Sequence, residues 1–453
     1  MSTRKKYLLI MFCLSLVIWQ SCRKDYTYVI PPPPGPHSTD TLFALFVTTS
    51  PDKITSPFWS KANYLSVNTT DVSKGLLYGY GWLNMTGTFS GETSFRSTNP
   101  GLTLKAAYDS ANLYILAEWQ DTVADFSYGS LMFNGSTDPK KTDTTNGWTY
   151  QRNCDHFAMA FEISSASSPN GTFTNAGCAA SCHGSGATAA MFPTAGTVDL
   201  WNWNTAHSAP MGYAEDMVAS SAGLSDDAGN KMWTPNINGA NGPKFEWNGT
   251  TQNVTLPNGT AAILDPAFYL LNTTPFVGNP HGGDTIYHKI FPGNADACST
   301  CHGDKGQGGE YGSVNTVGLI GKSRASLISS MNNQPEMAAY FPTLDSAALV
   351  NVLAYIRGLG GVPGAVLSVP GGSNADIIAV SNITPVDIKN AYKPQTTKHK
   401  QYQVLIIRKL KTNNPDDVQF DFSKSKTYIF GVALMDNDGK NHIGSLKETI
   451  KFK

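Results

Sequence analysis

The sequence has almost no net charge, few cysteines and no apolar run long enough for a membrane helix. Its 453 residues carry 33 Lys and Arg against 34 Asp and Glu, and this balance gives no reason to expect a nucleic-acid partner. The first apolar run, Tyr7 to Trp19, is too short to cross a bilayer as a stable helix. Long helical periodicity is absent before residue 320, which favours a β architecture for most of the chain.

Cysteine is scarce but grouped. Of the seven Cys, two lie in or at the end of the first apolar run, four form two short clusters that each end in His, and one is single. A disulfide framework would not place His directly after the second Cys twice. The two clusters therefore indicate haem or metal.

The N-terminus has the pattern of an export signal, because Arg4, Lys5 and Lys6 precede the apolar run. The run stops at Cys22, and residues 1–22 resemble a bacterial lipoprotein signal in which Cys22 is the lipidated first residue. A plain signal peptide with a free Cys22 is the alternative. Residues 23–40 contain a polyproline stretch that predicts a stiff linker. We expect an exported protein that a lipid tethers to the inner or the outer membrane, on the periplasmic side.

The strongest functional motif is Cys298-Ser-Thr-Cys301-His302. This spacing is typical of covalent haem c, because two thiols add to the two haem vinyl groups and the adjacent His reaches the iron. The motif predicts one covalently bound haem.

A second cluster reads Cys178-Ala-Ala-Ser-Cys182-His183. It has one residue more between the thiols, but the chemistry is unchanged if that residue bulges outward. We expect a further haem c here, with His183 on its iron. A disulfide between Cys178 and Cys182 is one alternative; a zinc site is another and would need a fourth ligand.

Short alternating apolar runs broken by Gly, Asn, Asp and Ser begin at Leu42. The clearest are Leu102 to Tyr108, Asn112 to Trp119 and His156 to Ile163, and the turn Asp109 to Asn112 predicts a hairpin between the first two. This region is expected to form a β-sandwich or a barrel-like sheet with function on its loops.

Three segments in this region carry a family resemblance. The order Lys105 to Asp121, then Gly177-Cys178, then Asp199-Leu-Trp-Asn-Trp203 resembles the haem-binding domain of ethylbenzene dehydrogenase gamma-type subunits. The resemblance implies a β-sandwich that holds haem in its loops and passes electrons between a molybdenum enzyme and its partners. This chain is similar to the members that carry a c-type motif in the haem loop.

The same resemblance implies ligands for the first iron. The family grips its haem with Met and Lys; Met191 occupies the place of that Met, and Lys447 falls near the place of that Lys. With His183 on one face, Met191 is preferred for the other face and Lys447 is the alternative. His207 is a third candidate.

Residues 284–362 have a different character. Ile286 to Ile290 reads as a short helix, Lys322 to Asn332 has helical spacing, and Asp345 to Leu359 reads as an amphipathic helix capped by Asp345. With the Cys298 motif between them, these helices resemble a class I cytochrome c. The resemblance makes Met337 the sixth ligand of the second iron, with Met331 as runner-up.

The last part of the chain returns to β patterns. Gln403 to Leu410, Tyr428 to Met435 and Glu448 to Phe452 resemble the closing strands of the gamma-type haem domain. We therefore expect a mainly β protein: a discontinuous β-sandwich haem-binding domain (41–283 and 363–453) with an inserted small α-helical cytochrome c domain (284–362). The alternative is an independent C-terminal β domain.

These features together predict a dihaem c-type cytochrome lipoprotein that transfers electrons. Its partners would be redox proteins, such as a molybdenum oxidoreductase or another cytochrome, with no nucleic acid. The alternative is a dihaem enzyme of the peroxidase or reductase type, or a gas-binding haem sensor, which requires an open iron site. Cys154 is expected to be a small buried side chain in a strand, and Trp201 and Trp203 are expected to pack against the haem or the core. The remaining histidines are expected to be surface or structural residues rather than ligands: His156, His281, His288, His399 and His442.

Overall fold

The structure is a computed structural model in which the chain divides into two compact units, Met1–Pro34 and Gly35–Lys453. The residues it describes all belong to the second unit, so the predicted signal, Cys22 and most of the linker lie outside them. The described residues are 37–38, 40–67, 101–121, 126–127, 130–133, 144–145, 147–150, 153–168, 171–175, 177, 193–227, 232–238, 242–290, 296–306, 321–338, 344–383, 400–422, 426–435, 442–445 and 447–453.

A large mixed sheet dominates the described residues and confirms the predicted mainly β fold. Its strands follow the order β15-β14-β13-β11-β26-β28-β2-β4-β5-β25-β24. The pairs of β2 with β28 and with β4 are parallel, whereas the other pairs along this order are antiparallel. The strand bounds are β2 (Thr41–Phe46), β4 (Thr103–Tyr108), β5 (Asn112–Asp121), β11 (His156–Ser168), β13 (Ala195–Asn204), β14 (Glu215–Ser220), β15 (Gly223–Asp226), β24 (Ile377–Ile383), β25 (Lys400–Lys409), β26 (Thr427–Met435) and β28 (Glu448–Phe452).

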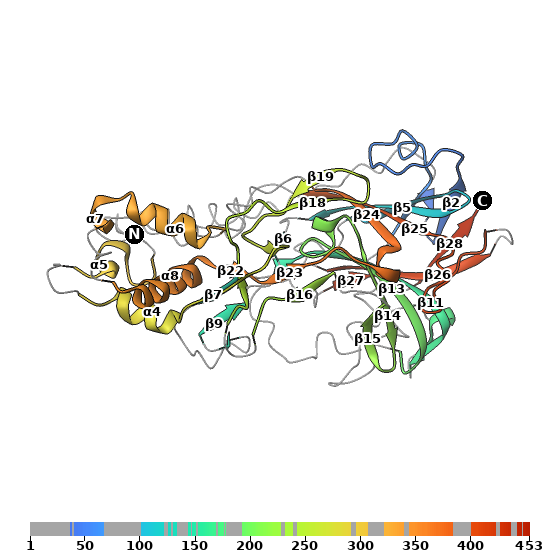
Figure 1. The fold of residues 1–453 in the computed structure, drawn as a ribbon. Coiled ribbons are helices and arrows are strands. Elements are labelled where there is room, and N and C mark those ends of the chain that lie inside the picture. The colour runs from blue at the N-terminus through green and yellow to red at the C-terminus, as the bar shows by residue number, and fades with distance from the viewer. Residues whose placement is uncertain are drawn as a thin grey trace, which may run out of the picture. The chain divides into compact units, whose positions relative to one another are not determined.

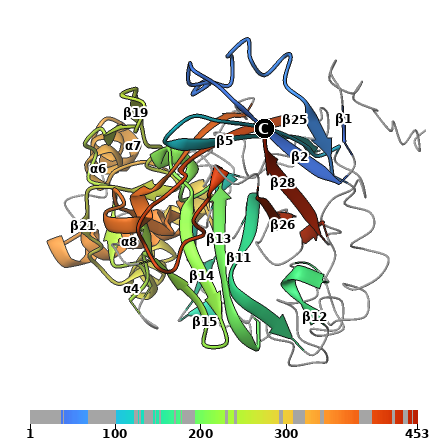
Figure 2. The ribbon, with the colours of Figure 1, turned by 90° about the vertical axis from the view of Figure 1, so that its right-hand side faces the viewer.

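The sheet folds into two layers around one core, as Figure 2 shows for β5 and β25 against β11, β13 and β14. Side chains alternate along each strand, so Phe157 and Phe161 of β11 both point into the core. The ring of Trp119, on β5, lies 5.6 Å from that of Phe157 and 6.0 Å from that of Trp203, on β13. Because β5 does not pair with β11 or β13, these contacts join the two layers. Trp201 and Trp203 are fully buried in this core, which confirms their expected packing role.

The two ends of the strand order meet. The amide of Ala214, just before β14, donates to the carbonyl of Ile377 on β24 over 3.1 Å, and the amide of Ala379 donates to Gly212 over 3.0 Å. Strands from the first and last parts of the chain are joined in one sheet, because β25 pairs with β5, β26 with β11 and β28 with β2.

Between these two sets of strands the described residues contain five helices (Figure 1). The helix predicted from Lys322 is α6, and the helix predicted from Asp345 is α8. Asp345 caps α8 as expected, because its Oδ1 accepts from the amide of Ala348 over 2.7 Å. The helices are α4 (Pro280–Tyr287), α5 (Cys298–His302), α6 (Arg324–Asn332), α7 (Pro335–Ala338) and α8 (Ser346–Gly360).

Helix α8 is buried on two sides, whereas its sequence pattern predicted one apolar face. Leu353 packs against Leu327 and Met331 of α6. Tyr355 and Leu359 instead pack with a second cluster that includes Phe133 of β7 (Ser130–Phe133) and Trp148 of β9 (Trp148–Tyr150). The second contact joins the helices to a four-stranded sheet, β22-β7-β9-β8, in which β22 (Val362–Pro363) directly follows α8.

The packing of α4 against α8 gives a first testable prediction. A Cβ atom on Gly283 would lie 2.0 Å from the carbonyl oxygen of Asn351 in α8. Gly283→Ala is therefore expected to destabilise the protein by about 1–3 kcal/mol, because backbone must move to make room. Gly282→Ala is the matched control, since its Cβ would meet the Asn351 side-chain nitrogen at 3.2 Å. Urea unfolding of both variants checks the difference, and equal stability of the two would contradict the observed helix contact.

Candidate functional site

The Cys298 motif forms a short helix of its own. Helix α5 contains Cys298, Cys301 and His302, and both thiols are free and half-buried. Residues three apart lie on neighbouring positions of a helix face, so the spacing presents both thiols from one side of α5. The helix ends at Gly303, whose φ of 78° is costly for any residue with a Cβ.

Two tyrosines hold the chain directly after His302. The Tyr287 hydroxyl, on α4, donates to the carbonyl of Gly303 over 3.2 Å, and the Tyr355 hydroxyl, on α8, donates to that of Asp304 over 3.0 Å. Burial raises the pKa of both phenols, so both remain neutral donors. The motif is thus positioned from α4 and α8 together. Tyr355 lies within the helix that the sequence predicted from Asp345 to Leu359, whereas the role of Tyr287 depends on a contact between distant segments.

The His302 imidazole has the properties that an iron ligand needs. Its Nδ1 is buried and has no hydrogen-bond partner in the described part of the chain. Burial lowers the pKa of His302 and so favours the neutral imidazole, which is the form that binds metal. A neutral imidazole directly after the second of two free thiols could hold a covalently attached haem.

The two candidate methionines differ in their packing. Met331 is buried in the contact between α6 and α8, where 8% of it is exposed. Met337, on the short helix α7, is half-buried at the margin of the same cluster. The Met331 side chain is therefore part of the core of this helical region, and the Met337 side chain is less constrained.

The residues expected to hold the first haem lie outside the described residues: Cys178, Cys182, His183 and Met191. The stem of their loop is described. β12 (Gly171–Thr172) pairs with the end of β11, and the amide of Thr194 donates to the carbonyl of Ser167 over 2.8 Å. Both ends of the loop therefore meet at the same end of β11. From there Phe173 packs onto Ala160 and Val198, on the face of the sheet that points away from the main core.

That outer face carries small side chains. Ala158 and Ala160 alternate with the core residues of β11, and their cross-strand partners on β26 are Ala433 and Gly431. Ala158 is 3% and Ala160 is 4% exposed. Phe173, Val198, Leu200 and Ile429 pack around Ala160 and cover this part of the face.

Lys447 lies between β27 (His442–Gly444) and β28, which both pair with β26. Gly444 is opposite Ala433 and Glu448 is opposite Phe430, so this stretch has one residue more than the matching part of β26 and does not follow strict alternation. The Lys447 side chain is exposed. Lys447 therefore lies beside β26, the neighbour of the strand β11 that carries the stem of the Cys178 loop.

His207 lies beyond the opposite end of β13 from that stem, a separation of ~30 Å for a strand of this length. Its ring stacks on Trp233 at 3.9 Å, and its Nδ1 lies 3.7 Å from Glu215 Oε1. Burial lowers the pKa of His207, and Glu215 partly opposes this effect. Cys154 is 1% exposed and lies 3.2 Å from the Nε2 of His156, which confirms its expected burial.

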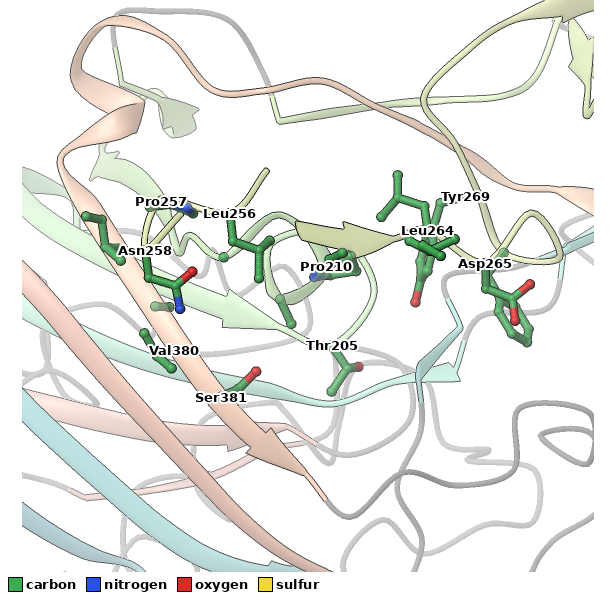
Figure 3. A pocket seen from close by; sticks show the side chains of 17 residues that line it. Thr205, Pro210, Leu256, Pro257, Asn258, Leu264, Asp265, Tyr269, Val380 and Ser381 are labelled. Carbon is green, nitrogen blue, oxygen red and sulfur yellow. The ribbon is translucent and has the colours of Figure 1, made fainter. Parts of the chain in front are cut away.

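A separate pocket of about 450 Å³ opens beside η1 (Ala209–Met211), β24 and the hairpin of β18 (Asn253–Thr255) and β19 (Ala261–Ile263). Figure 3 shows Leu256, Leu264 and Val380 among the side chains that line it. Of the described residues that were predicted to bind haem, none lines this pocket. The pocket is therefore distinct from the α5 site.

None of the described helices combines the length and the apolar character that crossing a membrane requires. This finding concerns only the part of the chain that the structure describes.

Comparison with known proteins adds two findings. The model of the family described as "Ethylbenzene dehydrogenase" matches residues 56–304, more than half of the chain, and it ends two residues after His302. The chain is also similar to the "Cbb3-type cytochrome c oxidase subunit CcoP" of Azospirillum sp. (strain B510), with 28% identity over 203 residues. That similarity covers 42% of this chain and 61% of the relative, so the chain spans less than two thirds of the relative's length.

Proposed function

The chain belongs to the ethylbenzene dehydrogenase family, and from this premise we propose that it is a dihaem c-type cytochrome that transfers electrons. The observation that carries the proposal is the α5 site, where two free thiols and a neutral imidazole lie on one short helix. The name of the similar protein, a cytochrome c oxidase subunit, supports the same role.

Residues 284–362 are proposed to be a class I cytochrome c domain inserted into the β-sandwich. The order of α4 to α8 around the Cys298 motif supports this assignment. The presence of β24 to β28 in the same sheet as β2 to β15 favours one interrupted sandwich over an independent C-terminal domain. Helix α4 begins at Pro280, so the helical segment starts a few residues before the boundary that the sequence predicted.

The first haem is proposed to be attached to Cys178 and Cys182, with His183 and Met191 on its iron and Lys447 as the alternative to Met191. The two ends of the loop meet at the end of β11, which supports a haem held in this loop beside the sandwich. The exposed position of Lys447 beside β26 keeps it as a candidate. The stacking of His207 on Trp233, at the far end of β13, disfavours it.

When bound, each haem supplies an iron that gains and loses one electron. The chain's own residues set the reduction potential of each iron, through the type of ligand and through burial of the haem. His302 would hold the second iron on one face while Tyr287 and Tyr355 fix the backbone that carries it. Met337 would hold the other face, because its partly buried side chain can change rotamer without leaving a cavity in the core.

The protein is further proposed to be a lipoprotein, tethered through Cys22 on the periplasmic side of a membrane, with residues 23–40 as spacer. This arrangement would let the folded part meet redox partners near the membrane surface. A molybdenum oxidoreductase and another cytochrome are the partner classes that the family and the similar protein suggest.

The competing function is a haem enzyme or a gas sensor, and it differs in needing an open iron. Carbon monoxide added to the reduced full-length protein tests this point, because an iron with two protein ligands does not bind the gas readily. The proposal expects no change in the haem absorption spectrum of the parent. Rapid, stoichiometric binding by the parent would favour the enzyme or the sensor.

The same assay tests the sixth ligand. Met337→Ala is expected to bind carbon monoxide at one haem per chain and to lower the reduction potential of that haem, because loss of the Met ligand leaves an open position. Met331→Ala is the matched control. It should retain the parent spectrum while losing about 2–5 kcal/mol of stability from the core. The opposite pattern between the two variants would assign the ligand to Met331.

A further inference from the structure

Strand β24 has one edge that faces away from its neighbour β25. The carbonyl of Ile377 accepts from the amide of Ala214 over 3.1 Å, and the chain after η1 therefore covers the first part of this edge. The amide of Ala379 donates to the carbonyl of Gly212 over 3.0 Å. Backbone groups alternate in direction along a strand, and β24 pairs with β25 without a shift of register. The carbonyl of Ala379 and both backbone groups of Ser381 therefore point to the same outer edge.

These three backbone groups continue the edge beyond the cover that η1 provides. Within the described ranges, the carbonyl of Ala379 and the amide and carbonyl of Ser381 make no hydrogen bond. β24 is also the last strand in the order of the large sheet. An edge with unpaired donors and acceptors is a template on which another strand can pair.

The pocket of about 450 Å³ lies against this part of the edge, since residues 378–381 form one of its walls. The other walls are mainly apolar and include Pro210, Leu256 and Leu264 (Figure 3). Ile263, which also lines the pocket, is 73% exposed. The volume lies within the range of pockets that bind small ligands. It is therefore large enough to receive a long side chain.

Asp265 places a carboxylate in this apolar pocket. Figure 3 shows it across the pocket from Val380 and Ser381. Its Oδ1 accepts from the amide of Ala267 over 2.8 Å. Burial raises the pKa of Asp265, and that amide opposes the effect, whereas no cation of the described residues does so. A positive group brought into the pocket would favour the ionised carboxylate.

We propose that the pocket and the β24 edge bind an extended peptide segment of a partner protein, which adds a strand to β24 and directs a Lys or Arg side chain toward Asp265. Strand addition supplies main-chain partners for the open groups of Ala379 and Ser381. Lys and Arg combine an apolar stem with a charged head. The stem matches the apolar walls, and the head matches the carboxylate at the far end.

This binding site goes beyond electron transfer and does not depend on the number of haems. The competing occupant is a small apolar molecule, which would fill the pocket but would use neither the strand edge nor the carboxylate. The two occupants differ in whether binding requires a peptide main chain and a positive charge.

The test uses the haem-loaded full-length protein and the fluorescein-labelled peptide Thr-Val-Lys-Val-Thr in fluorescence anisotropy. The peptide should bind saturably. A peptide with Glu in place of Lys should bind at least about tenfold more weakly, because it loses the charge-assisted contact with Asp265. A peptide N-methylated at its three central residues should lose at least about tenfold, because its main chain cannot donate to the edge.

Each outcome of the peptide series has a definite meaning. Absence of binding by the Lys peptide would overturn the site. Equal binding of the Glu peptide would overturn the role of Asp265. Equal binding of the N-methylated peptide would overturn strand addition and favour a pocket that recognises a side chain or a small molecule alone.

Ser381→Pro is the diagnostic variant, because it removes the open amide of the edge. Proline is tolerated on an edge strand where the amide points away from the sheet. The variant should lose about tenfold in affinity for the Lys peptide. Ser381→Ala is the matched control, since it keeps the amide and should bind as the parent does. Full affinity in Ser381→Pro would contradict the use of the edge.

Asp265→Asn tests the charge separately. Asn can still accept from the amide of Ala267, so the local turn is retained. The variant should bind the Lys and Glu peptides with similar affinity. An unchanged preference for Lys would contradict the proposed contact. The parent's Tm and haem spectrum show whether each variant is folded, and the N-methylated peptide tests the edge without any change to the protein.

Discussion

Replacement of both Cys298 and Cys301 by alanine is expected to remove one covalent haem from every chain. The two thiols are free and lie on one short helix with His302. The other described free thiol, Cys154, is buried in the sandwich beside His156 and cannot replace the thioether bonds. The mass of the denatured chain should fall by one haem, and pyridine haemochrome absorbance per chain should halve.

Cys154→Ala is the control for this experiment. Cys154 is buried beside His156 in the sandwich and should retain the full haem count. If the double variant kept the parent's covalent haem content, α5 would not be an attachment site. A haem lost equally in Cys154→Ala would point to general misfolding as the cause.

The largest expected loss of stability comes from Arg408→Met. Its guanidinium is fully buried, contacts Asp199 and Asp417, and lies 5.0 Å from the centre of the Trp201 ring. Among the described residues, Arg408 is the positive partner of these two buried carboxylates. Its removal costs about 3–5 kcal/mol, because the remaining charge stays uncompensated. Urea unfolding of parent and variant measures this loss.

Lys409→Met is the matched control for Arg408→Met. Lys409 is the next residue along β25, but its side chain is 57% exposed and pairs with Asp376. An exposed ion pair contributes about 0–1 kcal/mol. If both variants lost similar stability, the buried ion pairs of Arg408 would contribute no more to the free energy of unfolding than the exposed pair of Lys409 does.

The sequence predicted the elements whose signals are local. The hairpin at Asp109 formed as expected, because Asp109 Oδ1 accepts from the amides of Ala111 and Asn112. The start of helix α8 was also predictable, because its Asp345 cap and its apolar spacing lie within a few residues of each other. Family membership was likewise readable from short motifs, such as Asp199 to Trp203.

The start of α4 was placed wrongly, and the reason is physical. Ile286 to Ile290 was read as the helix, whereas α4 covers Pro280–Tyr287. Asn279 caps it and Pro280 opens it, but Gly282 and Gly283 read as helix breakers. Gly283 is needed because α8 passes too close for any Cβ. A contact between segments far apart in the sequence overrode the local propensity.

In the candidate site, too, local motifs were predictable and contacts between distant segments were not. Cys298, Cys301 and His302 could be found from spacing alone. Tyr287, which fixes the backbone after His302, carried no local signal, because its role depends on the approach of α4 to α5. The buried ion pairs of Arg408 with Asp199 and Asp417 were also unpredictable, since β25, β13 and the loop after β25 meet only in the folded sandwich.

Haem quantitation of the purified full-length protein tests the central proposal most directly. The parent should carry two covalent haems per chain by pyridine haemochrome and by intact mass. The double variant Cys178→Ala, Cys182→Ala should carry one, the double variant Cys298→Ala, Cys301→Ala should carry one, and the combination of all four changes should carry none. One haem in the parent, or an unchanged count in the Cys178→Ala, Cys182→Ala variant, would contradict the dihaem account.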